Sequence, residues 1–159
     1  MFLKLLTTAQ STAAWLTAVR HYEAGSHDAA IQTLMKLYRL RNLSAPSIDA
    51  PLRANLLLAT LAYWTGQPDL LRTCLKAIIN QAKAAQSRNS PATLAYALAY
   101  VRLLDGLAVD HYGSKYRPIT TFPQTQPIDL AAVRSDFIRL FPLEARANAV
   151  PSASGFKVA

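Results

Sequence analysis

The sequence predicts an all-α fold in which antiparallel helical hairpins stack on one another. Apolar residues make up 52% of the 159 residues and only five residues are glycine, which favours a packed helical core over strands or disorder. Three stretches with apolar residues at helical spacing each run into a glycine, and Gly25, Gly66 and Gly106 lie 41 and 40 residues apart. A period of this length is typical of repeated helical hairpins.

The first hairpin is expected to turn at Gly25. A helix is predicted over residues 8–24, where Trp15 and Tyr22 belong to an apolar stripe at helical spacing. Glycine tolerates the left-handed conformation that ends a helix, so Gly25 can terminate this one. A second helix begins directly afterwards, with Asp28 in its first turn, where a negative charge suits the helix dipole. The short connection makes the two helices antiparallel neighbours.

The second hairpin follows a loop over residues 42–51, which is rich in proline and serine. Its first helix is predicted over residues 50–65 and ends at Gly66. Pro68 then stands at the first position of the next helix, where a missing N–H group costs nothing. We expect that helix to fade near residue 86.

A fifth helix is predicted over residues 91–104, with Ser90 as its N-cap. It is expected to end at Gly106 or to continue to about Val109. Residues 1–106 therefore form a helical-repeat domain of about two and a half hairpins.

The last third of the chain changes character after Gly106. Residues 107–127 are predicted to be a linker, extended over residues 113–127, because turn formers and β-favouring residues dominate there. An amphipathic helix is predicted over residues 129–141, within a region at 128–148 that caps the repeat stack. Residues 149–159 are predicted to be a flexible tail.

The glycine-turned hairpins resemble the tetratricopeptide repeat family. The matching residues are Trp15, Ala18, Tyr22, Gly25, Ala30 and Leu34 in the first unit, Leu58, Ala59, Tyr63, Gly66 and Leu75 in the second, and Ala95, Leu98, Ala99 and Gly106 in the third. The resemblance covers about residues 14–106, with Leu71 in place of the expected alanine and a period nearer 40 than the family's usual 34 or so. It implies a short α-solenoid in which the first helices of the hairpins line a groove that binds peptides.

Lysine and arginine outnumber aspartate and glutamate 17 to 9, giving a net charge of +8. Such a surplus favours acidic proteins, nucleic acid or an anionic membrane as partners, although the basic residues are not concentrated in one run. Cys74, the only cysteine, falls within an apolar helical pattern and is expected in the core. The three histidines lack metal-ligand spacing, and no phosphate loop or catalytic motif occurs in the sequence. We therefore expect no enzyme, no metal and no cofactor.

Two sets of candidate binding residues follow from position and charge. Arg20, Tyr63 and Arg102 are expected to point outward into the groove, and Tyr116 lies in a loop that interleaves aromatic and basic residues. A second set could form a basic surface that binds phosphate on the second and fourth helices: Lys36, Arg39, Arg41, Arg72, Lys76 and Lys83. The alternative is that both sets serve only packing, solubility and helix-end charge complementarity.

Three functional hypotheses are consistent with these features. The first is a non-enzymatic adaptor or chaperone that binds a peptide segment or helix of a partner protein; a small secretion-system chaperone would be one version, by analogy of size and architecture. The second is a nucleic-acid-binding helical protein. The third is a homo-oligomer in which residues 113–127 occupy a neighbour's groove. No run of 18 apolar residues occurs and Lys4 interrupts the apolar start, so we expect a cytoplasmic chain without a membrane span.

Overall fold

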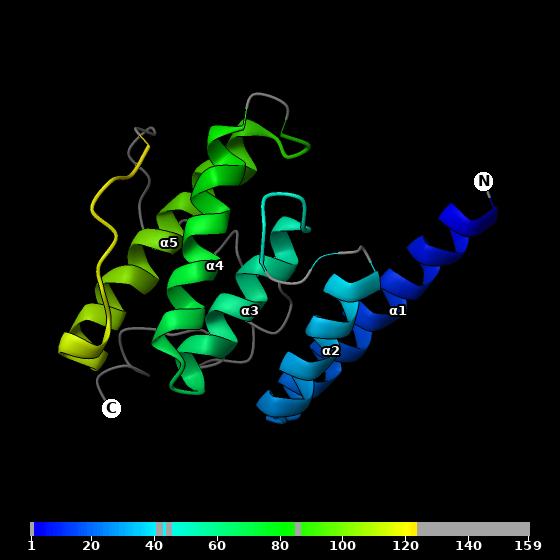
Figure 1. Cartoon of the computed structure of the whole chain (residues 1–159), viewed down its shortest axis with the longest axis horizontal. Helices are drawn as coiled ribbons and strands as arrows, with labels where there is room; N and C mark the ends of the chain where they lie inside the picture. Colours follow the sequence, from blue (N-terminus) through cyan, green and yellow to red (C-terminus); the bar gives the residue numbers. More distant parts are fainter. Residues whose placement is uncertain (1, 41–42, 44–45, 85–86, 124–159) are drawn as a thin grey trace.

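The computed structural model describes residues 2–40, 43, 46–84 and 87–123, and these residues form helices and no strand. The helices are α1 (Phe2–Glu23), α2 (His27–Leu40), α3 (Leu52–Trp64), α4 (Pro68–Lys83) and α5 (Pro91–Tyr112), followed by a single 3-10 turn, η1 (Gly113–Lys115). The all-α prediction is confirmed for this part of the chain. Each helix packs against the next one along the chain, and α5 also reaches α3 (Figure 1).

Two of the three glycines predicted to end helices, Gly25 and Gly66, do form turns. Gly25 has φ +79° and Gly66 has φ +72°, which places both in the left-handed region. In each turn the N–H group three residues beyond the helix bonds back to a carbonyl of its last turn: Ser26 to His21 at 2.8 Å, and Gln67 to Ala62 at 2.9 Å. This is the Schellman arrangement, which satisfies carbonyls that a helix end would otherwise leave free. The two turns fold α1 onto α2 and α3 onto α4.

The fifth helix, expected to end at Gly106 or to continue to about Val109, is longer than both alternatives. Helix α5 continues to Tyr112, and the left-handed glycine that follows it is Gly113, with φ +58°. Continuation buries Ala108 beside Leu104 on the face that packs against α3 and α4. The regular spacing of about 40 residues therefore holds for the first two turns only.

The predicted linker over residues 107–127 is also corrected. Its first six residues are helical and the next three form η1. Residues 116–123, which we call the strap, have no regular secondary structure and turn back along α5 (Figure 1). Residues 124–127, the capping helix predicted within 128–148 and the tail at 149–159 lie outside the described residues.

A buried carboxylate holds the strap in place. Asp105 on α5 accepts hydrogen bonds from the Tyr116 hydroxyl and from the Ile119 amide, the latter at 3.0 Å. On α4, Arg72 Nε donates to the Arg117 carbonyl at 2.8 Å. These bonds hold the strap against α5 and α4.

The core is made mainly of leucine, alanine and aromatic residues from α1 to α5. Ala18 and Ala59, small residues at matching positions of the first two units, are fully buried. Cys74 is also fully buried, as expected, and burial raises the pKa of its thiol well above the ordinary value. Tyr100 on α5 shares a 2.8 Å hydrogen bond with Thr60 on α3 inside this core.

Helix α5 bears on the expectation that the chain has no membrane span. Among the described residues, the stretch Pro91–Lys115 is long and apolar enough to cross a membrane by length and composition alone. Many of its apolar side chains, Val101 and Leu104 included, are instead buried against the rest of the fold. The core helix of a globular protein meets the same criterion.

Candidate functional site

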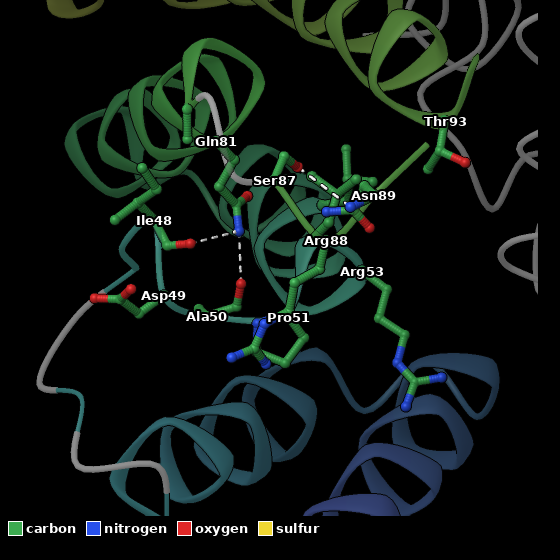
Figure 2. A pocket seen from close by; sticks show the side chains of 13 residues that line it. Ile48, Asp49, Ala50, Pro51, Arg53, Gln81, Ser87, Arg88, Asn89 and Thr93 are labelled. Atoms are coloured by element: carbon green, nitrogen blue, oxygen red, sulfur yellow. Dashed lines mark hydrogen bonds between the residues drawn. The ribbon is translucent and has the colours of Figure 1, made fainter. Parts of the chain in front are cut away.

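The described residues form a cleft of about 760 Å³. Two parts of the chain that are far apart in sequence line it (Figure 2). The first is the loop before α3 and the start of that helix, at residues 48–56, and the second runs from the end of α4 into α5, at Gln81, Ala84 and residues 87–93. Its floor is apolar, since Leu52 and Leu56 are buried core residues. Its upper walls carry polar and charged side chains. We refer to this hollow as the cleft.

A buried amide, Asn55, joins the two hairpins beneath the cleft. Its side chain is 0% exposed and accepts a 2.7 Å hydrogen bond from the Tyr38 hydroxyl on α2. Its Nδ2 group donates to the Ser47 carbonyl at 3.0 Å and to Gln81 Oε1 at 3.1 Å. Asn55 therefore ties α2, α3, α4 and the loop between the hairpins together, with its own polar atoms satisfied.

Gln81 extends the same network into the wall of the cleft. Its Nε2 group donates to the Ile48 carbonyl at 3.1 Å and to the Ala50 carbonyl at 2.6 Å, as Figure 2 shows. These bonds fix the loop before α3 at two points. The wall is thus held by buried hydrogen bonds, which is the rigidity a binding surface needs to avoid the cost of ordering on association.

The opposite wall is fixed by local hydrogen bonds. Ser90 caps α5, since its hydroxyl accepts from the Thr93 amide at 3.2 Å, which confirms the predicted N-cap. Just before it, the Ser87 hydroxyl accepts from the Asn89 amide at 3.2 Å. These two short motifs set the direction of Arg88, which Figure 2 shows reaching toward Pro51 across the cleft.

Arg53 is the second cation of the cleft. Its guanidinium lies 4.7 Å from the centre of the Trp15 ring on α1, a cation–π contact that orients the side chain. Partial burial lowers the pKa of Arg53 from its ordinary value, but arginine keeps its charge in proteins. Asp49 is the one acidic residue among the described residues that line the cleft, so the lining as a whole is cationic.

A second, shallower hollow of about 740 Å³ lies on the other side of the loop before α3. Its lining includes Arg72 and Lys76 from α4, together with Asp69. Ile48, 44% exposed, borders both hollows.

Two of the four predicted groove and loop residues, Tyr63 and Tyr116, are buried. Tyr63 is 4% exposed, so the outward orientation expected for it was wrong. Tyr116, predicted as a binding residue in a loop of aromatic and basic residues, is 3% exposed. Tyr63 packs edge-on against Tyr112, and Tyr116 is held by Asp105. Both were misplaced because the end of α5 and the strap fold back over them.

The other two predicted groove residues are exposed but lie apart. Arg20 is an exposed residue of α1. Arg102 is exposed on α5, where its guanidinium lies 4.6 Å from the Phe122 ring of the strap. Neither lines the cleft or the second hollow.

The predicted basic surface is brought together only in part. Arg72 and Lys76 share the second hollow, but Arg72 is already bonded to the strap. Lys36, Arg39 and Lys83 are exposed and line neither of the two hollows, while Arg41 lies outside the described residues.

The sequence reasoning missed Arg53, Arg88, Asn55 and Gln81. A signal existed for the two amides, because each lies on the buried face of a largely apolar stretch: Asn55 is next to Leu56, and Gln81 is two residues after Ile79. A buried polar side chain needs a partner, so such positions indicate tertiary hydrogen bonds. No comparable signal marked the two arginines, whose proximity depends on the packing of the hairpins.

Among the described residues, no group of three histidine, cysteine, aspartate or glutamate side chains is placed to hold a metal ion. Comparison with protein-family models, with curated proteins and with solved structures gives no match.

Proposed function

We propose that this chain is a non-enzymatic protein-interaction domain, an adaptor or chaperone that binds a peptide segment of a partner protein. The observation that carries the proposal is the cleft. It combines an apolar floor with polar walls that buried hydrogen bonds hold in place. Pockets that bind ligands share this combination of apolar area and a few fixed polar groups.

Two further features support the proposal. The volume of about 760 Å³ is in the range that accommodates a few side chains of a bound peptide. The two glycine-turned hairpins also support a short arrangement like that of the tetratricopeptide repeats, in which stacked hairpins present a peptide-binding surface. The surface that we propose, however, lies at the ends of the hairpins, between the loops, rather than on their first helices.

A nucleic-acid-binding function is the second candidate, supported by the second hollow. Arg72 and Lys76 lie there on a chain of net charge +8. Binding driven by phosphate contacts weakens steeply as salt is raised, whereas peptide binding to a partly apolar cleft does not. Salt dependence therefore separates the two candidates.

The experiment that tests the proposal is selection of binders from a library of short random peptides on the immobilised chain. Affinities of the selected peptides and of a labelled single-stranded oligonucleotide are then measured by fluorescence anisotropy at low and high salt. We expect peptide binding that is lost when Ala84→Trp fills the cleft with an indole ring and kept when Ala29→Trp places the same ring on α2. Failure to select any peptide, or equal binding to the two variants, would contradict the proposal.

A further inference from the structure

The two arginines of the cleft are available to an external anion. Within the described part of the chain, neither the Arg53 nor the Arg88 guanidinium pairs with a carboxylate; Arg53 stacks on Trp15, and Arg88 extends over Pro51 (Figure 2). Their positions are set by fixed backbone, since one lies in the first turn of α3 and the other in the hydrogen-bonded turn before α5. The cleft thus presents two guanidinium groups against the single carboxylate of Asp49.

Guanidinium groups bind carboxylates especially well. Their planar fork of N–H donors matches the two oxygens of a carboxylate, and the resulting charge-assisted bonds are stronger than neutral ones. Apolar side chains also line the cleft, at Pro51 and at the exposed Ile48. A ligand that matches this lining carries carboxylates next to a branched or aromatic apolar side chain.

We propose that the cleft binds an acidic peptide segment of a partner protein, with carboxylates on Arg53 and Arg88 and a neighbouring apolar side chain over Ile48. This inference rests on the proposed function and adds the class of peptide. The charge of the cleft complements such a segment, and its apolar floor accommodates the side chain between the acidic residues.

The lining favours an acidic peptide over nucleic acid. Proteins that bind single strands stack the bases on aromatic side chains, and the described lining of the cleft includes no aromatic residue. The Trp15 ring, which Arg53 contacts, is 7% exposed and does not line the cleft. Phosphate contacts alone would also call for a longer row of cations than these two arginines provide.

The test uses a fluorescent peptide of alternating glutamate and leucine, and a matched peptide in which glutamine replaces glutamate. The glutamate peptide is expected to bind at least about tenfold more tightly, which is the effect of losing one charge-assisted hydrogen bond. Arg88→Ala should weaken binding of the glutamate peptide by roughly tenfold. Asp49→Asn should tighten it by a few-fold, because the only acidic group of the described lining is removed.

Arg39→Ala is the matched control, because it removes the same charge from an exposed position on α2 outside the cleft. All three variants change exposed side chains, and unchanged circular dichroism and melting temperature verify that the fold is retained. Equal affinity for the two peptides, or equal losses for Arg88→Ala and Arg39→Ala, would overturn the inference. If library peptides still bind and are displaced by Ala84→Trp, that result would leave the proposed function standing and reject only the preference for acidic segments.

Discussion

Truncation of Asn55 to alanine is expected to destabilise the protein by about 3 kcal/mol. The asparagine is fully buried and makes three hydrogen bonds, to Tyr38, Ser47 and Gln81. Without it, the Tyr38 hydroxyl and the Gln81 carbonyl oxygen lose a partner in the core, and each buried unsatisfied group costs about 1–3 kcal/mol. The Ser47 carbonyl lies in a partly exposed loop, where water can replace the bond.

Two reference variants isolate the effect of the network. Tyr38→Phe removes one hydroxyl and leaves one unpaired oxygen on Asn55, so we expect a loss of about 1–2 kcal/mol. Asn80→Ala truncates an exposed asparagine one residue before Gln81 and should change stability by less than about 0.5 kcal/mol. Because Tyr38 and Asn55 share a bond, the double variant should lose less than the two single losses added together.

The assay is urea unfolding followed by circular dichroism, with the free energy of unfolding obtained by linear extrapolation. A loss below about 1 kcal/mol for Asn55→Ala, or strict additivity with Tyr38→Phe, would refute the role given to this network. The buried hydrogen bonds would then not be what holds the loop before α3.

Three more predictions concern the glycines, the strap and the cysteine. Gly66→Ala should lower the free energy of unfolding by about 1 kcal/mol or more, because φ is +72° at this position. Gly106→Ala should raise it by about 0.5–1 kcal/mol, because Gly106 lies inside α5 and nothing lies within 4 Å of the added methyl group. Melting temperatures should therefore fall for the first variant and rise for the second. Asp105→Ala should release the strap and speed tryptic cleavage after Lys115, and an unchanged cleavage rate would mean that other contacts hold it. Burial raises the pKa of the Cys74 thiol above its ordinary value of 9.0. Above pH 9 the unfolded state therefore binds fewer protons than the folded state, so the free energy of unfolding should fall as the pH rises. In unfolding titrations, this fall just above pH 9 should be shallower for Cys74→Val.

Local chemistry explains what could be predicted from the sequence. Gly25 and Gly66 are each followed at once by helix-starting residues, such as Asp28 and Pro68, so turn and restart could be read together. Gly106 is followed by Leu107 and further apolar residues instead. The apolar residues after Gly106 thus indicated that the helix continues, but the regular spacing of the three glycines favoured the opposite interpretation.

Contacts between distant segments explain what could not be predicted. Tyr63 and Tyr116 have the composition of surface anchors, but the strap and the end of α5 bury them. Arg53 and Arg88 line the same cleft because Gln81 holds the loop before α3 against the end of α4. Neither the burial of the two tyrosines nor the placement of the two arginines can be predicted from residue spacing or composition.

The measurement that tests the central claim most directly is site-specific photocrosslinking in the cells from which the protein comes. A photoreactive amino acid is placed at Ile48, which borders the cleft, or at Val109, which is similarly exposed on α5 away from it. The account predicts one discrete, nuclease-resistant protein adduct from position 48, none from position 109, and loss of the adduct when Arg88→Ala is added. Equal crosslinking from both positions, an adduct that nuclease removes, or one that does not depend on Arg88 would contradict it.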